Sequence, residues 1–234
     1  MKKLSIILII LLSLNDAAYS QIKFINSKVE SYVKKVLSNF DSISGDRKKD
    51  LEKIANWIAT KSKVNDKTEI TIICTHNSRR SHFGQVWLQI AARYYGFTKI
   101  YVYSGGTEAT ALNQRALNAL KRTGLKIEKI GNDKQNPKFN LYYSKNENPV
   151  LLYSKRYDDI QNPKNGFAAI MVCSQADEAC PNVPGADVKF AIPYEDPKAS
   201  DNTPYETARY DETCLKIASE MFYIMYKVKQ LYKP

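Results

Sequence analysis

Short apolar runs alternate with segments of helical periodicity from Glu69 onward, and this alternation limits the possible folds more than any other feature of the chain. The apolar runs lie at 70–74, 99–104, 168–173 and 188–192, and helical spacing marks 83–94, 112–120 and 204–231. Strands that alternate with helices form a parallel sheet whose two faces the helices cover. The sequence therefore predicts an α/β fold with a small parallel four-stranded sheet and helices on both faces.

Two segments lie outside this alternation. Residues 25–63 show apolar spacing typical of two amphipathic helices, separated near Gly45, and predict a helical extension at 21–66 before an α/β domain at 67–234. Residues 128–166 are rich in Asn, Lys, Tyr and Pro and are too long for a simple connecting loop. We therefore expect them to be an insertion that carries a hairpin near 139–155.

The first twenty residues have the pattern of a secretory signal peptide. Lys2 and Lys3 precede an apolar run that continues to Leu14, and the small-residue pattern Ala18-Tyr19-Ser20 follows. An uncleaved membrane anchor is the alternative, but the run is short for a bilayer span. We expect cleavage after residue 20, a periplasmic or secreted protein, and no membrane association after cleavage.

The mature chain would be strongly basic. Loss of residues 1–20 removes two lysines and Asp16 and leaves 33 basic and 23 acidic side chains, a net charge of about +10. A basic balance favours anionic partners such as nucleic acids, anionic surfaces or anionic substrates. Because export argues against nucleic acid and the lysines are dispersed, we expect no nucleic-acid partner and a solvated basic surface.

The segment CTHNSRRS, Cys74 to Ser81, lies between an expected strand and an expected helix. The C-x5-R spacing of Cys74 and Arg80 is weak evidence by itself, but backbone N–H groups of such a loop point inward and the helix start adds positive potential. This arrangement predicts a loop that binds a tetrahedral oxyanion. Its members besides the cysteine and the clamping arginine would be Thr75, His76, Asn77, Ser78, Arg79 and Ser81.

The same loop provides the residues for nucleophilic catalysis. Positive potential favours the thiolate of Cys74, which is the nucleophilic form of cysteine. Arg80 can hold two oxygens of the anion with its planar guanidinium. We expect Ser81 to donate its hydroxyl to the thiolate and Asn77 to brace the loop through its amide.

Asp196 is the candidate general acid. It lies in Tyr194-Glu195-Asp196-Pro197, directly after the last expected strand, and loops at the carboxyl ends of parallel strands gather over one site. A carboxyl there can protonate a departing oxygen. The alternative is a solvated turn carboxylate beside a proline.

Four ordered segments, CTHNSRRS, VYSGGTEATALNQRALNALKRTGLKI, VCSQADEACP and YEDP, resemble the low-molecular-weight protein tyrosine phosphatase superfamily and, within it, the thioredoxin-coupled arsenate reductases. The resemblance covers about residues 70–230 apart from the insertion. It implies a small parallel sheet with helices on both faces, Cys74 as nucleophile, Arg80 as clamp and Asp196 as acid. His76 takes the place of the usual loop glycine, and Arg79 takes the place of a frequent second cysteine. We expect His76 to change the loop path or the pocket size relative to the family pattern.

The resemblance also implies a thiol relay. Cys74 would attack arsenate, Cys173 would release arsenite, and Cys180 would close a disulfide for a thioredoxin-like reductant. Because a disulfide holds its Cα atoms about 4.4–6.8 Å apart, residues 174–179 would have to curl or unwind. A static Cys173–Cys180 disulfide is the alternative in an exported protein.

Two other functions stay open. A low-molecular-weight protein tyrosine phosphatase would need only Cys74, Arg80 and Asp196 and would hydrolyse phosphomonoesters through a phosphocysteine. An exported domain could also bind a small oxyanion without catalysis. In each case the partner is an oxyanion or a phosphorylated substrate.

The remaining candidates point to no cofactor. His76 and His82 are the only histidines, too few for a zinc site, so we expect no metal and no cofactor apart from the reductant. Cys214 lies on the apolar face of the last helix and is expected in the core. The tyrosines of the insertion could line a pocket for an aryl phosphate, although tyrosines on hairpins are often packing residues; they are Tyr142, Tyr143, Tyr153 and Tyr157.

Overall fold

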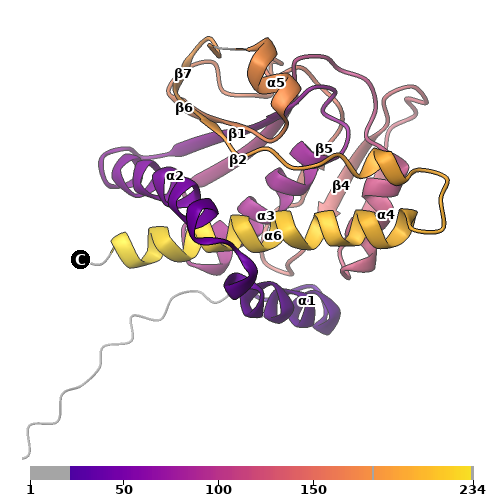
Figure 1. The fold of residues 1–234 in the computed structure, drawn as a ribbon, viewed down its shortest axis with the longest axis horizontal. Helices are drawn as coiled ribbons and strands as arrows, with labels where there is room; N and C mark the ends of the chain where they lie inside the picture. The colour runs from indigo at the N-terminus through magenta and orange to yellow at the C-terminus, as the bar shows by residue number, and fades with distance from the viewer. Residues whose placement is uncertain (1–21, 181, 233–234) are drawn as a thin grey trace, which may run out of the picture.

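A four-stranded parallel sheet forms the centre of the molecule in a computed structural model, which describes residues 22–180 and 182–232. In the order β2-β1-β6-β7, its strands are β1 (Thr68–Cys74), β2 (Ile100–Gly106), β6 (Phe167–Met171) and β7 (Ala186–Ala191). The predicted α/β fold is therefore confirmed, and the sheet lies between α5 (Ser174–Ala179) and α6 (Glu206–Leu231) in Figure 1. The predicted signal peptide lies outside the described residues.

The central strand β1 is buried because both of its neighbours and the covering helices exclude water. Its sequence TEITIIC is rich in β-branched residues, which fit a pleated surface, and Ile70, Ile72 and Ile73 are fully buried. A nearly continuous apolar run of this kind is typical of a parallel strand covered on both faces. The strand ends at Cys74, so its carboxyl end delivers the cysteine to the edge of the sheet.

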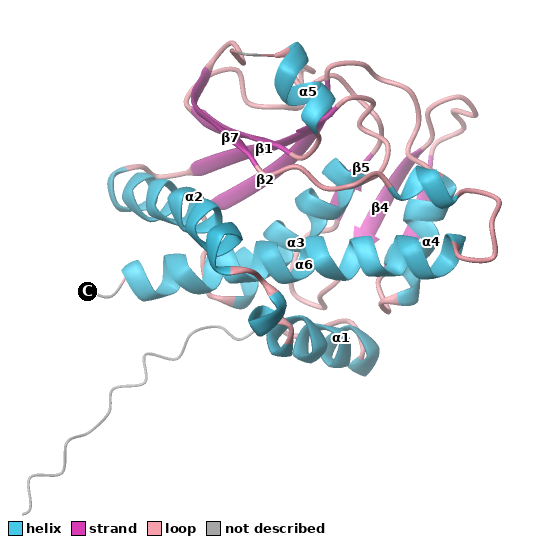
Figure 2. Ribbon diagram, in the orientation of Figure 1, coloured by secondary structure: helices cyan, strands magenta, loops and turns pink. Residues whose placement is uncertain are grey.

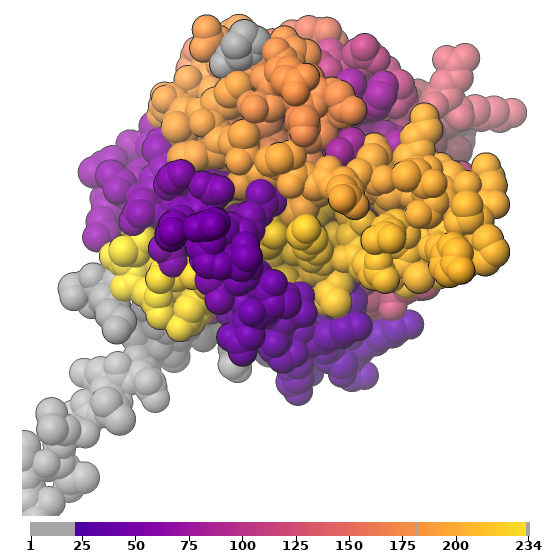
Figure 3. All heavy atoms as spheres, viewed as in Figure 1, coloured from indigo at the N-terminus to yellow at the C-terminus, as the bar shows by residue number. Residues whose placement is uncertain are grey.

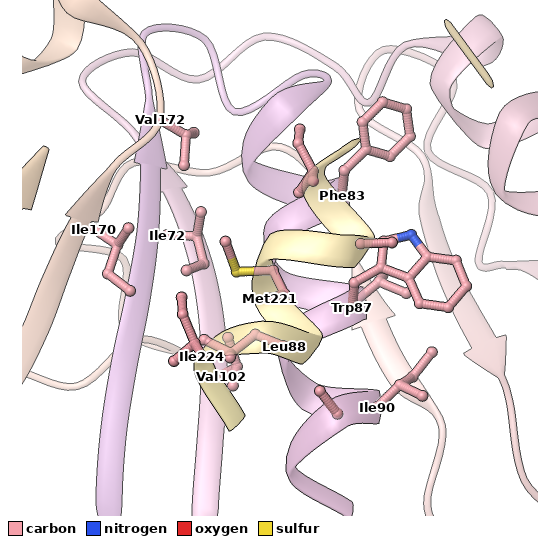
Figure 4. Close-up of a cluster of buried hydrophobic side chains, with 14 of the residues drawn as sticks. Ile72, Phe83, Trp87, Leu88, Ile90, Val102, Ile170, Val172, Met221 and Ile224 are labelled. Carbon is pink, nitrogen blue, oxygen red and sulfur yellow. The ribbon is translucent and has the colours of Figure 1, made fainter. Parts of the chain in front are cut away.

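Two helices form the main layer against the sheet, α3 (Arg80–Tyr94) and α6 (Glu206–Leu231). Their apolar side chains meet those of β1 and β2 in the core shown in Figure 4. A Cβ on Gly84 would lie 2.8 Å from Ile72 Cγ2, so glycine allows α3 to approach β1 closely. Cys214 is fully buried on α6 and accepts a hydrogen bond from Trp87 Nε1 at 3.2 Å, as expected for a core cysteine.

The N-terminal extension consists of α1 (Ser27–Ser38), a 3-10 turn (Phe40–Ser42) and α2 (Gly45–Val64). Asn26 and Ser44 cap the two helices by accepting hydrogen bonds from backbone N–H groups in the first turn. Both helices pack on α6, and Figure 3 shows their indigo atoms against the yellow atoms of that helix. Their buried side chains belong to the same core as the sheet, whereas the division at residues 66 and 67 stays a prediction.

The insertion forms a separate three-stranded antiparallel sheet of β3 (Lys126–Ile130), β4 (Lys138–Tyr142) and β5 (Val150–Leu152). The predicted hairpin corresponds to β4 and β5, whereas β3 was not predicted. β3 follows α4 (Gln114–Arg122). That helix ends near Gly124, whose φ of +101° is the left-handed conformation that glycine adopts at helix ends. Figure 2 shows β4 and β5 apart from the central sheet.

Two short helices complete the fold. α5 (Ser174–Ala179) follows β6, and a 3-10 turn, η2 (Pro197–Ser200), follows the last strand of the sheet. Among the described helices, none combines the length and the apolar character needed to cross a bilayer. Both short helices begin at the edge of the sheet to which β1 brings the cysteine.

Candidate active site

Cys74 lies at the carboxyl end of β1 and is 4% exposed. Its Sγ atom is 3.1 Å from Ser81 Oγ, and Ser81 Oγ accepts a hydrogen bond from Asn77 Nδ2 at 2.9 Å. Because the amide occupies an acceptor position of the hydroxyl, the Ser81 proton is free to be donated to the sulfur. The Ser81 hydroxyl is therefore placed to donate a hydrogen bond to the Cys74 sulfur.

Asn77 gives the loop its sharp turn. Its φ is +44°, in the left-handed region that asparagine tolerates better than most residues. Its Oδ1 accepts a hydrogen bond from the backbone N–H of Lys155 at 2.9 Å. The Asn77 side chain therefore connects the loop to the insertion while its amide holds Ser81.

The buried side chain of His82 supports the same turn by a hydrogen bond to its backbone. The ring is fully buried, and burial, with a smaller effect of the Lys155 charge, lowers the pKa of His82 to about 3. The imidazole is therefore neutral at pH 7. Its Nε2 atom lies 2.9 Å from the carbonyl oxygen of Asn77 and donates to it, while Nδ1 faces Ser104 Oγ at 3.4 Å.

His76, which takes the place of the usual loop glycine in the resemblance, has an ordinary backbone conformation. Among the described non-glycine residues, only Asn77 and Asn202 have positive φ, so His76 does not need the glycine conformation. Its carbonyl accepts hydrogen bonds from Ser154 Oγ at 2.9 Å and Thr110 Oγ1 at 3.3 Å. Its exposed ring lies beside Glu108 at 3.6 Å and lines the mouth of the cavity.

Arg79 and Arg80 both reach the segment that carries Asp196. Arg80 Nη2 donates to Asp196 Oδ2 at 2.7 Å, and Nη1 donates to the carbonyl oxygen of Tyr194 at 2.8 Å. Arg79 Nη1 lies 3.8 Å from the same Asp196 oxygen, and its Nε donates to Tyr210 Oη at 3.1 Å. Two guanidinium groups thus meet one carboxylate that is 31% exposed.

The other loop residues fix the backbone. Thr75 accepts a hydrogen bond at its carbonyl oxygen from the backbone N–H of Glu108 at 2.8 Å. Ser78 donates through Oγ to the carbonyl of Ala111 at 2.7 Å. The loop is therefore held on the β2 side by the segment that follows β2.

A cavity of about 590 Å³ opens over this loop. It brings together the oxyanion loop, the start of α5 and the segment of the candidate acid, and its lining residues are Thr75, His76, Arg80, Ser174, Gln175, Pro193, Tyr194, Glu195 and Asp196. Of the predicted site residues, Thr75, His76, Arg80 and Asp196 line this cavity, whereas Cys74 is not among its lining residues. None of the four tyrosines expected from the insertion is among the residues that line it.

Cys173 lies next to the loop, and Cys180 lies at the other end of α5. Cys173 is fully buried after β6, with its Sγ atom 3.4 Å from Thr75 Oγ1. All four cysteines, each in a described segment, are free thiols in the structure. A helical rise of about 1.5 Å per residue separates the Cα atoms of Cys173 and Cys180 by about 10 Å, more than the roughly 7 Å limit of a disulfide.

Several contacts of the site were not predicted from the sequence. Ser154 and Lys155 come from the insertion, and no local pattern connects them to Asn77 and His76. Gly106 was interpreted only as a strand end, but a Cβ there would lie 2.6 Å from the carbonyl oxygen of Thr75. A glycine pair inside a strand is a signal of close backbone approach and could have indicated this contact.

Potential metal ligands do not gather in the described parts of the chain. Within residues 22–180 and 182–232, no group of three or more His, Cys, Asp or Glu side chains is placed to hold a metal ion. Among the described residues that line the cavity, by contrast, Arg80 supplies a positive charge at the start of α3. The site is therefore suited to an anion.

No protein-family model matches the chain. It is 30% identical over 157 residues to arsenate reductase 2 of Staphylococcus epidermidis, covering 67% of this chain and 97% of that protein. It is 29% identical over 157 residues to the arsenate reductase of Staphylococcus aureus strain Newman, covering 67% of this chain and 96% of that protein. Both similarities therefore extend over nearly the full length of the staphylococcal proteins.

A solved structure is also similar to the chain. The low-molecular-weight phosphotyrosine phosphatase from Vibrio cholerae O395 matches with a TM-score of 0.43 and 15% sequence identity, covering 67% of this chain and 93% of that chain.

Proposed function

Because this chain belongs to the superfamily of low-molecular-weight protein tyrosine phosphatases and arsenate reductases, we propose that it is a cysteine-dependent enzyme that reduces arsenate. The observation that carries the choice of reaction is the position of Cys173. Its sulfur contacts Thr75, the residue next to Cys74, at the carboxyl end of the neighbouring strand β6. A second thiol beside the nucleophile is useful for reduction and is not needed for hydrolysis.

The first step forms a bond between sulfur and arsenic. Arsenate binds to the backbone N–H groups of the loop and to Arg80, which must then share its guanidinium between the anion and Asp196. The Cys74 thiolate attacks arsenic, and one arsenate oxygen leaves as water after protonation by Asp196. Ser81 donates its hydroxyl to the thiolate before the attack.

The second step transfers two electrons to arsenic. The Cys173 thiolate attacks the Cys74 sulfur, a disulfide forms, and the electron pair of the sulfur–arsenic bond leaves with arsenic as arsenite. Cys180 then attacks Cys173, which releases the Cys74 thiolate. An external dithiol, supplied by a thioredoxin-like protein, reduces the Cys173–Cys180 disulfide.

The relay requires α5 to unwind. The helix has six residues, and Cys180 is partly exposed at its end. A helix this short gains little from its own hydrogen bonds, so its unwinding costs less than that of a long helix. Unwinding would remove the separation of about 10 Å that the helical rise imposes between the two cysteines.

A phosphomonoesterase is the second candidate, and the size of the cavity favours it. The space of about 590 Å³ extends from the loop to His76 and Glu195 and can admit more than a bare tetrahedral anion. Hydrolysis would use only Cys74, Arg80 and Asp196. A phosphocysteine would form and then react with water.

The choice between the two reactions is tested by parallel assays of arsenate reduction, with a thiol reductant, and of aryl phosphate hydrolysis. We expect Cys74→Ser and Cys173→Ser to abolish arsenite release, and Cys180→Ser to stop after one turnover with Cys74 and Cys173 joined in a disulfide. Hydrolysis that persists in Cys173→Ser and Cys180→Ser, without arsenate turnover by the unmutated protein, would show a phosphatase. Absence of both activities would leave oxyanion binding as the function.

The location of the protein decides which reductant can serve it. The N-terminal pattern supports export, so the thioredoxin-like partner would have to lie outside the cytoplasm. Mass spectrometry of the protein from cell fractions tests this part of the proposal. A mature chain that begins at Gln21 in the exported fraction is expected, and a full-length chain found only in the cytoplasm would contradict export.

A further inference from the structure

A second cavity, of about 270 Å³, lies between α3, β2 and the insertion. It shares no lining residue with the cavity over Cys74. Its polar and aromatic lining includes Gln85 and Arg93 from α3, Tyr101 from β2, and Tyr143, Tyr153 and Lys155 from the insertion. Two of the tyrosines considered for an aryl phosphate pocket therefore line a different space.

Lys155 brings a nearly buried positive charge to this cavity. The residue is 4% exposed, and its Nζ atom lies 4.5 Å from the centre of the Tyr153 ring. To the described residues, Nζ makes neither a hydrogen bond nor an ion pair. Asp159, whose charge acts on the lysine, already accepts a hydrogen bond from Tyr153 Oη at 3.0 Å.

The ammonium group remains charged at neutral pH. Burial lowers the pKa of Lys155 to about 8, so most molecules carry the proton at pH 7. Because Nζ has no hydrogen-bond acceptor among the described residues and is not a fully buried atom, it faces the open space of the cavity, where an anionic group can accept its hydrogen bonds.

Tyr143 supplies a second donor at the same cavity. It is 2% exposed, and its hydroxyl makes no hydrogen bond to any described residue. Burial raises the pKa of Tyr143, which keeps the hydroxyl protonated. Arg93, in contrast, is already satisfied by Glu147 at 3.1 Å and by the carbonyl oxygen of Phe97 at 2.6 Å.

The rest of the lining is suited to an aromatic ring. Tyr101 and Tyr153 contribute aromatic side chains to the lining, and Pro149 and Val150 add apolar ones. The volume is small beside the range of about 300–1,000 Å³ that is usual for ligand pockets. The cavity therefore fits a ligand with one ring and one anionic group.

We propose that this second cavity is a binding site for a small aromatic carboxylate, whose carboxylate accepts hydrogen bonds from Lys155 Nζ and Tyr143 Oη. The backbone N–H of Lys155 also holds Asn77 of the oxyanion loop, so the ligand would bind beside the support of that loop. The site does not depend on which reaction Cys74 carries out. Binding can therefore be tested separately from catalysis.

Isothermal titration of the full chain with benzoate tests the site, in a phosphate concentration that saturates the oxyanion loop. We expect one benzoate per chain and no binding of the neutral analogue benzamide. Lys155→Met should weaken benzoate binding by about tenfold or more, because a charged hydrogen bond is lost, and Tyr143→Phe by a smaller factor.

Lys138→Met is the matched control. The Lys138 Nζ atom lies 4.8 Å from the centre of the same Tyr153 ring, but this lysine is exposed and does not line the cavity. Its replacement should leave benzoate affinity unchanged. Circular dichroism establishes that each variant is folded. If Lys155→Met does not fold, the test rests on two other measurements: the benzoate affinity of Tyr143→Phe and the binding of benzamide to the unmutated chain.

The proposal is wrong if benzoate does not bind in the presence of phosphate, or if benzamide binds equally well. Equal benzoate affinity of the unmutated chain and a folded Lys155→Met variant would overturn it too.

Discussion

At the scale of single residues, the chemistry of Cys74 depends on a chain of short hydrogen bonds. Lys155 donates its backbone N–H to Asn77, Asn77 donates its amide to Ser81, and Ser81 faces the sulfur at 3.1 Å. Each link fixes the orientation of the next, so the Ser81 proton is directed at Cys74. The sulfur proposed as the nucleophile is thus connected through these contacts to a residue that lies 81 positions later in the chain.

Replacement of Ser81 by alanine tests the last link. We expect alkylation of Cys74 by iodoacetamide at neutral pH to slow by about tenfold, because the thiolate loses a hydrogen bond worth roughly 1.5 kcal/mol. Mass spectrometry of the modified peptide, in a Cys180→Ser background, measures the rate at Cys74 alone.

Ser78→Ala is the control for this measurement, because its hydroxyl donates to the Ala111 carbonyl and not to the sulfur. An alkylation rate that changes equally in both variants would show that Ser81 acts only through the loop structure.

His82 predicts how stability depends on pH. Its pKa is about 3 in the folded chain and 6.5 in the unfolded chain, so the neutral ring contributes stability above pH 6.5 that is lost as pH falls toward 3. Well below pH 6.5, the free energy of unfolding should fall by about 1.4 kcal/mol per pH unit through this residue. Urea unfolding of the unmutated protein and His82→Gln, between pH 7 and about pH 5, measures the slope.

His82→Gln should show a shallower decline, since glutamine does not titrate. Identical slopes for the two proteins would contradict a neutral buried histidine. Other titrating groups are common to both proteins, so the difference between the slopes reports His82.

The loop itself could be predicted from sequence, whereas its supports could not. Cys74, Arg80 and Ser81 lie in one short segment whose position between a strand and a helix determines their geometry. Ser154 and Lys155 reach the loop only through the folding of the insertion. Long-range contacts of this kind leave no periodic signal in a single sequence.

At the scale of elements, the outer edge of β2 is closed by side chains and by the insertion. Gln89 accepts from the backbone N–H of Val102 at 3.0 Å and faces the Ile100 carbonyl, which also accepts from Arg93 at 2.9 Å. Farther along, Gly106 pairs with the insertion at Arg156. An edge strand covered in this way offers few free groups for pairing with another chain.

Gln89→Ala should therefore destabilise the protein. Loss of the side chain leaves the buried Val102 N–H without a partner, which should lower the free energy of unfolding by about 1–3 kcal/mol. Urea unfolding measures the change. Gln114→Ala is the control, since Gln114 is exposed and bonds only to Asn118 on α4; an equal loss in both variants would argue against edge protection.

The elements that were predicted have strong periodic patterns, and those that were missed do not. β1 and α3 are buried and regular, so their residues repeat as expected. β3 was missed because its sequence KIEKI is charged and half-exposed, without a buried apolar face. α5 was not predicted as a helix, because six residues are too few to show helical spacing; residues 174–179 were expected only to curl or unwind if the thiol relay operates.

At the scale of the whole molecule, the N-terminal extension reaches the segment that carries Asp196. Arg47 on α2 donates to Glu220 at 2.8 Å and to the Ile192 carbonyl at 3.1 Å, and its guanidinium lies 4.8 Å from the Tyr194 ring centre. Tyr194 in turn donates to Glu220 at 2.7 Å. Contacts from α2 and α6 therefore hold Tyr194, whose carbonyl oxygen also accepts a hydrogen bond from Arg80.

Arg47→Met should reduce activity although the residue lies outside the cavity. Without the guanidinium, Tyr194 loses a contact and Glu220 is left as a buried charge, so the segment that carries Asp196 should become less ordered. We expect kcat for arsenate or aryl phosphate to fall by about tenfold, with a smaller change in KM, because displacement of an acid by about 1 Å has large kinetic effects.

Two further variants separate this positioning effect from a loss of stability. Lys49→Met on the same helix removes only an exposed pair with Asp46 and should leave kcat unchanged. Arg47→Met combined with Glu220→Gln should recover stability in urea, since no buried charge is left, while kcat stays low because the Ile192 contact and the Tyr194 stacking are still absent. Recovery of kcat together with stability would mean that α2 only stabilises the fold; low kcat in a stable double variant would make the extension part of the support of the active site.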